Sequence, residues 1–156
     1  MKRGGLGRRR PSNAEILLDS NVFLEVELAG EHAKACKALL RMIERGELRA
    51  VITDFHVDSI VVIMERYGAG WEGIYRFLVS LLLYRGLRVH SPGLAGRIRA
   101  ARYMREYGLD FDDALALQVM EELSIDTIVS YDKHFDSVEW VKRNTPEELL
   151  SARSAR

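Results

Sequence analysis

Cysteine is nearly missing from this chain, which has only Cys36 among its 156 residues. A single cysteine excludes a disulfide framework within the chain and a zinc site built from several thiolates. Scarce cysteine is also typical of proteins in a reducing compartment, so we expect a cytoplasmic protein.

A long hydrophobic run and an excess of one charge are missing as well. The longest apolar run, FLVSLLLY at 77–84, is far shorter than the roughly 20 residues of a membrane-spanning helix, so we expect no membrane partner. Lys and Arg together number 23, as do Asp and Glu, and the formal net charge is zero. This balance argues against a globally basic nucleic-acid-binding protein and allows a local basic patch.

The N-terminal segment carries positive charges with no apolar segment behind them, so the sequence does not predict a secretory signal. We expect residues 1–14 to form a flexible basic arm. With 47% hydrophobic and 29% charged residues, the rest of the chain suits one globular domain, which we place at 15–150. We expect residues 151–156 to form a disordered tail.

Strand and helix patterns alternate along this domain. Buried apolar runs predict strands, and apolar residues at helical spacing between breakers and caps predict helices. The predicted strands lie at 15–18, 48–53, 87–90, 126–130 and 138–142, and the predicted helices at 21–28, 31–45, 54–66, 71–84, 92–107 and 111–123, with a last helical turn at 146–150. This alternation is typical of an α/β fold with a mostly parallel sheet.

Acidic residues occur where such a fold builds its sites, beyond the carboxyl ends of the strands. Asp19 ends the first strand and Asp132 follows the fourth, so the two would emerge side by side if these strands are neighbours. Asp58 and Asp113 lie near the starts of helices that could reach the same edge. Crowded carboxylates raise one another's pKa unless a cation is present, and Mg²⁺ and Mn²⁺ prefer oxygen ligands.

Each acid also has an ordinary structural interpretation. Asp19 suits a turn after a strand, and Asp54 suits a helix cap, which would leave Asp58 as an exposed acid. In the segment DFDD, Asp110 would cap the following helix and Asp113 would serve its N-terminus.

Four segments together resemble the PIN-domain nucleases, and most closely the VapC-like toxin ribonucleases of archaea and bacteria. The segments are LLDSNVFLE, VITDFHVDSIV, GLDFDDALALQVMEEL and IVSYDKHFDSV, and the resemblance extends over roughly residues 15–142. It implies a three-layer α/β/α PIN-like fold around a central, mostly parallel sheet of four to five strands. It also implies a ribonuclease that depends on Mg²⁺ or Mn²⁺.

The resemblance also gives roles to individual residues. Asp19, Asp113 and Asp132 match the family's acids and would hold metal and take part in catalysis. Asn21 matches the polar residue that supports the first acid, and Ser130 lies where Thr or Ser is usual, so both would orient ligands.

Two further acids complete the expected site. Asp136 is a possible additional metal ligand. The family's second acid is usually a Glu on the helix after the second strand, and a close register puts Ser59 there, with Asp58 one residue earlier. We expect Asp58 to serve as the catalytic acid, with Asp54 or Glu65 as fallbacks, although one residue turns a side chain by about 100° around a helix.

Basic side chains should surround a pocket that accepts RNA. Lys133, Arg97, Arg99 and Arg102 are the candidates for phosphate contact, and each is also an ordinary surface charge. His56 and His134 could help, although a lone histidine is more often structural or exposed.

The helix predicted at 71–84 leaves little polar face, so it should be buried in the core or at a subunit contact. The resemblance implies a homodimer and an antitoxin protein as partners. The leading hypothesis is thus an endoribonuclease toxin of a toxin–antitoxin pair. The alternative is a non-catalytic PIN-like domain that binds RNA or protein through a degenerate metal site. A phosphoryl-transfer enzyme of another α/β family is disfavoured, because YDKHF matches such sites poorly.

Overall fold

A five-stranded parallel sheet forms the centre of the computed structural model, which describes residues 14–156. The basic arm expected at 1–14 lies outside the described residues except for its last one. The strands are β1 (Ile16–Leu18), β2 (Ala50–Thr53), β3 (Leu87–His90), β4 (Thr127–Val129) and β5 (Lys142–Asn144). The helices are α1 (Ser20–Glu27), α2 (Ala33–Glu44), α3 (Asp54–Arg66), α4 (Trp71–Leu81), α5 (Gly93–Tyr107), α6 (Phe111–Glu122) and α7 (Pro146–Ser154), with a 3-10 helix η1 (Lys133–Ser137).

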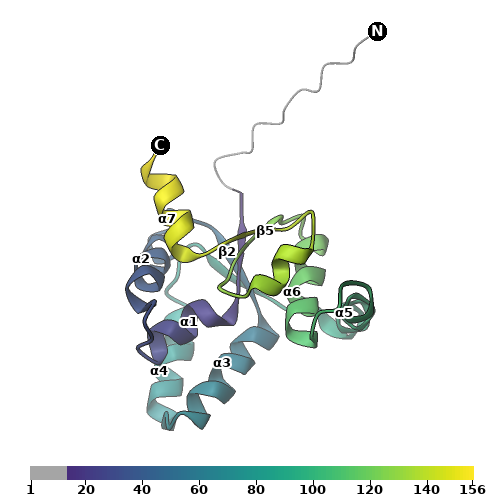
Figure 1. The fold of residues 1–156 in the computed structure, drawn as a ribbon. Helices are drawn as coiled ribbons and strands as arrows, with labels where there is room; N and C mark the ends of the chain where they lie inside the picture. Colours follow the sequence, from purple (N-terminus) through teal and green to yellow (C-terminus); the bar gives the residue numbers. More distant parts are fainter. Residues whose placement is uncertain (1–13) are drawn as a thin grey trace.

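Apolar side chains on both faces of the sheet produce three layers. Ile16 and Leu18 of β1 pack in one cluster with residues of α1 to α4, whereas Leu17 between them packs with residues of α6 and η1. Successive strand residues point to opposite faces, so a strand buried on both faces is continuously apolar. Figure 1 shows α5 and α6 on one side of the sheet and α1 and α2 on the other. The three-layer α/β/α prediction is confirmed.

The strand order β3-β2-β1-β4-β5 sets the position of the site. The chain builds the sheet outward from β1 through β2 and β3 on one side, and later through β4 and β5 on the other. The carboxyl ends of β1 and β4, which pair at Leu17–Ile128 and Leu18–Val129, therefore meet at the switch point of the sheet. Crevices at such points are the usual binding sites of open α/β sheets.

Two predictions near the C-terminus are wrong in position. The segment 138–141 forms no strand, since it turns through hydrogen bonds from Val138 N to Phe135 O and from Val141 N to Val138 O. The last strand is the polar Lys142–Asn144, which pairs with β4. Helix α7 continues to Ser154, into the expected disordered tail, because Thr145 caps its start and α7 packs on α2.

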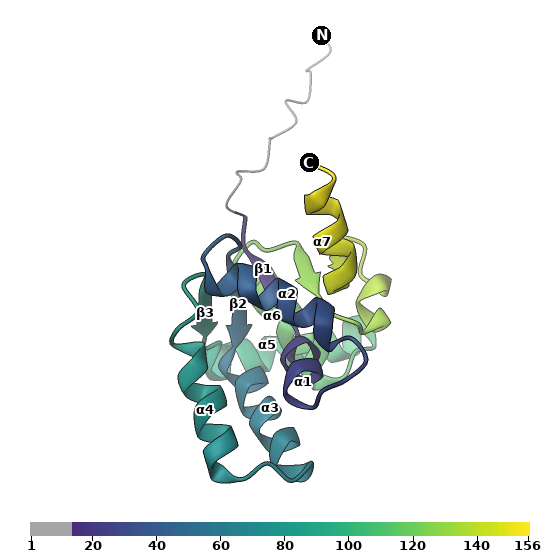
Figure 2. The ribbon, with the colours of Figure 1, turned by 90° about the vertical axis from the view of Figure 1, so that its left-hand side faces the viewer.

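Helix α4 is not buried in the core, which was one of the two places expected for it, and the subunit contact stays a prediction. Figure 2 shows α3 and α4 side by side, extending beyond the end of the sheet. Only Phe77 and Leu81 of α4 are buried, while Trp71 and Tyr75 are exposed, as is Leu82 just after the helix. The missing polar face thus reflects an apolar surface of this chain rather than burial in its core. No helix within residues 14–156 combines the length and the apolarity that crossing a membrane requires.

Candidate functional site

Asp19 lies at the carboxyl end of β1, buried and held by hydrogen bonds. Its Oδ1 accepts from Ser20 N at 2.8 Å, which makes Asp19 the cap of α1. Its Oδ2 accepts from the Ser130 hydroxyl at 2.6 Å and from Asn21 Nδ2 at 3.3 Å. The structure therefore brings Asn21 and Ser130 to the acid that they were expected to orient, and the carboxylate has a fixed direction.

Asp113 and Asp132 reach the same edge from two other elements. Asp110 caps α6 by accepting from Asp113 N at 3.0 Å, which fixes the buried Asp113 in the first turn of that helix. Asp132 follows β4, and its N–H donates to the Ser130 hydroxyl oxygen at 2.9 Å. The hydroxyl of Ser130 thus connects the backbone of Asp132 to the carboxylate of Asp19.

Burial and mutual repulsion make the ionised forms of these acids unfavourable unless a positive charge lies nearby. Burial raises the pKa of Asp19, although His56 and the Ser130 hydrogen bond oppose this shift. Burial, followed by the neighbouring carboxylates of Asp132, Asp110 and Asp19, raises the pKa of Asp113 to about 8. Asp113 Oδ2 is also buried without a hydrogen-bond partner among the described residues. A divalent cation would satisfy this oxygen and favour the ionised carboxyl groups, so these residues fit a metal ion.

Two histidines extend the carboxylates into two groups with ligand atoms close enough for metal binding. Asp19, His56 and Asp112 form one group, and Asp113, Asp132 and His134 form the other; within each group the ligand atoms lie within 4.8 Å of one another. In the second group, the exposed His134 Nδ1 is 3.0 Å from Asp132 Oδ1 and 3.5 Å from Asp113 Oδ2.

His56 is the less expected of the two histidines. It is 1% exposed in the first turn of α3, and its Nδ1 pairs with the hydroxyl of Thr53, the cap of that helix. Its Nε2 is 2.6 Å from Asp112 Oδ1. Burial lowers the pKa of His56, but the Asp112 carboxylate and then Asp19 outweigh this effect, so the pKa lies above its ordinary value.

Several predicted site residues do not join these groups. Asp58 is exposed, and neither group of ligand atoms in residues 14–156 includes it. The fallback Glu65 is exposed as well, and Asp54 accepts hydrogen bonds from Phe55 N and from Ser91. Thr53, rather than Asp54, caps α3.

Asp136 also lies outside both groups and has a different partner. Its two carboxylate oxygens accept from Arg143 at 2.8 and 3.0 Å, and this pairing lowers the pKa of Asp136. Arg143 also donates to the Ser130 carbonyl at 3.1 Å, so it supports the loop that carries Asp132.

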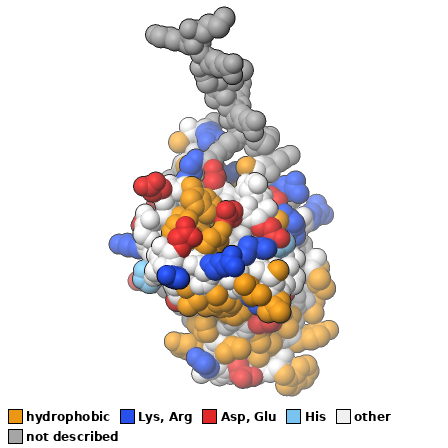
Figure 3. All heavy atoms as spheres, turned by 90° about the vertical axis from the view of Figure 1, so that its right-hand side faces the viewer, with side chains coloured by type: hydrophobic (Ala, Val, Ile, Leu, Met, Phe, Trp, Pro, Cys, Tyr) orange, Lys and Arg blue, Asp and Glu red, His pale blue; other side chains and the backbone are white. Residues whose placement is uncertain are grey.

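The basic candidates are spread over the surface of α5 and η1. Lys133 lines a shallow hollow with Asp110 and His134, beside the second ligand group. Arg97 contacts Asp54 at 3.5 Å, Arg102 is exposed, and Arg99 lies beside Glu122 at the far end of α6. Figure 3 shows a band of Lys and Arg side chains across this face of the molecule, with hydrophobic side chains gathered below it.

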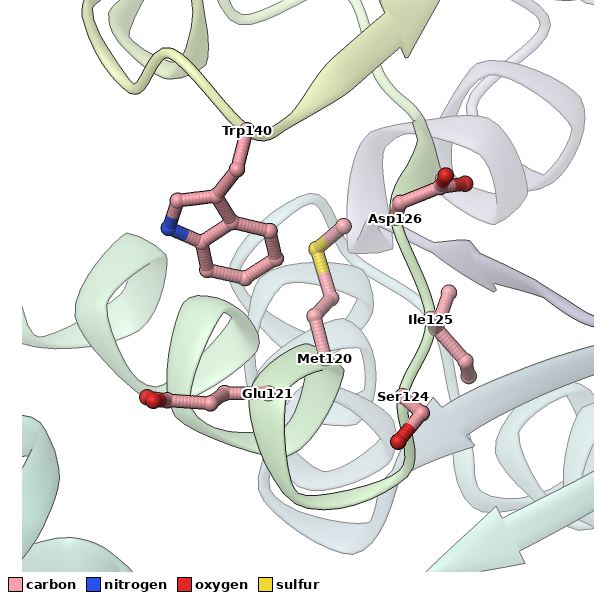
Figure 4. Close-up of a pocket in the computed structure, with 6 residues that line it drawn as sticks. All are labelled: Met120, Glu121, Ser124, Ile125, Asp126 and Trp140. Atoms are coloured by element: carbon pink, nitrogen blue, oxygen red, sulfur yellow. The ribbon is translucent and has the colours of Figure 1, made fainter. Parts of the chain in front are cut away.

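A separate pocket lies at the other edge of the sheet. Met120, Ile125 and Trp140 supply its apolar walls, and Figure 4 shows the indole ring facing the methionine. The pocket adjoins the residues that precede β4, whereas the acids follow the strands. It is therefore distinct from the candidate metal site.

Sequence reasoning missed the pairing of His56 with Asp112. Asp112 drew no attention inside DFDD, and His56 appeared only as a possible helper. A signal was present, because His56 precedes Ser59 by three residues and positions three apart share a helix face. One turn before Ser59, the residue at the family's second acidic position, helix α3 therefore carries a side chain of a type that can bind metal.

Comparison with known proteins agrees with this architecture. The chain is similar to VapC20 of Mycobacterium tuberculosis, a toxin described as cleaving the Sarcin-Ricin loop, with 15% identity and a TM-score of 0.65 over 81% of this chain and 96% of that one. It is also similar to a chain of a toxin-antitoxin complex from Klebsiella pneumoniae, with 16% identity and a TM-score of 0.62 over 84% and 97% of the two chains. No sequence among the curated proteins matches. The sequence profile of the PIN domain matches residues 16–141, and the chain belongs to the PIN-domain family.

Proposed function

We propose that this protein is a metal-dependent endoribonuclease and the toxin of a VapBC-type toxin–antitoxin pair. The observation that carries the proposal is the convergence of Asp19, Asp113 and Asp132, from three separate elements, at the switch point of the sheet. Membership of the PIN-domain family and the two toxin-related structures support it. The substrate would be cytoplasmic RNA.

The chain's own residues would perform three tasks in hydrolysis. Asp19, Asp113 and Asp132 would hold the cation, Mg²⁺ or Mn²⁺, and Asn21 and Ser130 keep Asp19 aligned for it. When bound, such a cation supplies Lewis acidity and lowers the pKa of a water molecule. The negative pocket itself repels RNA, so Lys133, Arg97 and Arg102 would contact phosphates, with Arg99 farther away.

An exposed apolar surface supports the expected protein partners. Val62 of α3 and Trp71, Tyr75 and Leu78 of α4, with Leu82 beyond it, are all at least 40% exposed. Contiguous apolar surface of this kind marks protein interfaces. We propose that α3 and α4 bind the antitoxin or a second copy of this chain.

One observation favours the second candidate, a non-catalytic PIN-like domain that binds RNA or protein. Ser59 at the second acidic position donates its hydroxyl to Phe55 O at 2.9 Å, and the neighbouring Asp58 is exposed. No acid of α3 therefore enters the groups of ligand atoms found in residues 14–156.

Cleavage of labelled single-stranded RNA, and of a Sarcin-Ricin loop oligonucleotide, distinguishes the two candidates. The nuclease hypothesis predicts cleavage with Mg²⁺ or Mn²⁺ that EDTA abolishes. Asp19→Asn and Asp113→Asn should each lower the rate by at least about 100-fold, the upper end of what the loss of a merely orienting partner costs.

Two further variants, one as a control and one to test the role of Asp58, complete this experiment. Glu121→Gln, an exposed acid on the same helix as Asp113, should leave the rate unchanged. Loss of activity in Asp58→Asn would give Asp58 the catalytic role predicted from the sequence, and retention would remove it. Wild-type protein that neither cleaves RNA nor binds Mn²⁺ in calorimetry would support the binding domain.

A further inference from the structure

His56 lies one helical turn before the position at which the family's acid is missing. Helix α3 carries Ser59 at the family's second acidic position, and a serine hydroxyl that donates to Phe55 O cannot supply a charged oxygen ligand. His56 lies one helical turn earlier, and residues three apart point from the same face of a helix. Its imidazole therefore reaches from α3 toward the group of ligand atoms that includes Asp19.

Thr53 fixes the orientation of the His56 ring and is compatible with the tautomer that metal binding requires. Its hydroxyl oxygen accepts from His56 N at 3.0 Å and also pairs with His56 Nδ1. When Nδ1 donates its hydrogen to this oxygen, the lone pair lies on Nε2. Metal-binding histidines are commonly held in this way, with one ring nitrogen donating to the protein and the other facing the metal.

His56 Nε2 and the nearest carboxylate oxygen, Asp112 Oδ1, form a close ion pair that lacks hydrogen-bond geometry. Within residues 14–156, His56 Nε2 and Asp112 Oδ1 are both buried and have no hydrogen-bond partner, although they lie 2.6 Å apart. Proximity without hydrogen-bond geometry distinguishes this pair from the well-aligned pair of Arg143 with Asp136. A cation coordinated by both atoms would satisfy both, with Asp19 as a third ligand from β1.

We propose that His56, Asp19 and Asp112 form a mixed nitrogen–oxygen metal site in which His56 replaces the acid missing at Ser59, and that Asp19 is shared between this site and the cation held with Asp113 and Asp132. The inference rests on the proposed function, because it concerns the cation of the same edge of the sheet. Mg²⁺ strongly prefers oxygen ligands, whereas imidazole nitrogen suits transition metals. The site therefore selects Mn²⁺ and later divalent transition metals over Mg²⁺.

Pulsed electron paramagnetic resonance of Mn²⁺ bound to the full chain tests this directly, because a coordinated imidazole produces a ¹⁴N coupling. The coupling should be present in the wild type, lost in His56→Gln and retained in His134→Gln. His90→Gln is the matched control, because His90 is also a partly buried histidine beside a carboxylate, 3.4 Å from Glu122, but outside both ligand groups.

Calorimetry supplies a second measurement that does not depend on activity. His56→Gln should weaken Mn²⁺ binding by about tenfold or more, the scale of losses around metal sites, and weaken Mg²⁺ binding much less. His90→Gln should change neither affinity. Circular dichroism shows whether each variant is folded. If His56→Gln does not fold, the ¹⁴N coupling of the wild type and of His134→Gln still tests the inference.

Each result has one meaning. Mn²⁺ binding without a ¹⁴N coupling in the wild type would overturn the inference and leave the proposed nuclease intact. A coupling that persists in His56→Gln and disappears in His134→Gln would place the nitrogen ligand in the other group and also overturn it. Absence of divalent metal binding would overturn both proposals.

Discussion

Ser130 is a single hydroxyl on which two parts of the site depend. It donates to Asp19 Oδ2 at 2.6 Å and accepts from Asp132 N at 2.9 Å. Ser130→Ala removes both bonds and leaves Asp19 Oδ2 with only the longer hydrogen bond from Asn21, at 3.3 Å. We therefore expect the nuclease rate to fall about 10–100-fold, with the fold retained. RNA cleavage rates measure this effect.

A serine elsewhere provides the control. Ser80 donates to Phe77 O within α4, remote from the acids, so Ser80→Ala should cleave at the wild-type rate. Equal rates for Ser130→Ala and the wild type would show that the alignment of Asp19 does not limit the reaction.

Asp113 should make the metal-free protein sensitive to pH. Its pKa is raised from 3.8 to about 8, chiefly by burial, so folding favours the neutral carboxyl. That stabilisation is fully present below about pH 4 and is lost as the pH rises through about 8. We therefore expect the melting temperature in EDTA to fall over this range, and Mn²⁺ to restore it near pH 8 because a cation favours the ionised form.

Thermal melts by differential scanning fluorimetry check this trend. Asp113→Asn cannot ionise, so its melting temperature should vary less with pH over the same range. A wild-type melting temperature that rises from pH 5 to pH 8 in EDTA would contradict the assumed protonation of Asp113.

The sequence predicted most of the residues that meet in the site, because local patterns mark the strand ends and the helix cap that place them. Asp19 and Asp132 follow neighbouring parallel strands, and Asp113 follows a recognisable cap, so their positions depend on local patterns. Whether Asp58 or His56 faces the site depends on the rotation of α3 about its axis, and the packing of the helix sets that rotation. One residue of rotation, about 100°, leaves Asp58 exposed.

At the scale of elements, Gly86, which lies between α4 and β3, packs closely against the end of α2 and the segment before β2. A Cβ at this position would lie 2.2 Å from Leu48 O and 2.9 Å from Ile43 O, both of which are backbone atoms. Gly86→Ala should therefore destabilise the protein by about 1–3 kcal/mol, the cost of overpacking. Chemical denaturation measures this change.

Gly73 gives the opposite expectation in the same part of the fold. It lies in α4, and a Cβ there meets nothing within 4 Å. Gly73→Ala should stabilise the protein by about 0.5–1 kcal/mol, because glycine is unfavourable within a helix. Equal effects of the two substitutions would contradict the close approach at Gly86.

Helices and strands were predictable where apolar residues in the sequence are buried in the fold, and not where polar residues form a strand or apolar residues stay exposed. The buried apolar strands β1, β2 and β4 are clear in the sequence. Edge strand β5 is the polar segment KRN, which is held by pairing with β4. Because its residues are polar, the strand was predicted at the more apolar residues just before it. Apolar content likewise could not separate a buried α4 from one that presents an apolar surface.

For the whole molecule, the exposed side chains of α3 and α4 predict self-association unless an antitoxin covers them. Leu82, just after α4, is 85% exposed, so Leu82→Lys should lower the molar mass that light scattering detects after size exclusion. Leu94→Lys is the control and should leave the molar mass unchanged, because Leu94 is also highly exposed, at 75%, but lies at the start of α5. Equal masses for the wild type and Leu82→Lys would exclude this surface as the dimer contact.

The placement of β1 beside β4 has a consequence during protein synthesis. Asp19 leaves the ribosome early, but its partners Ser130 and Asp132 lie more than a hundred positions later, and Arg143, which supports their loop, lies later still. A nascent chain has no completed site until nearly all of it has emerged. The proposed nuclease therefore has no activity until translation is almost finished, and C-terminal truncations before β5 should be inactive.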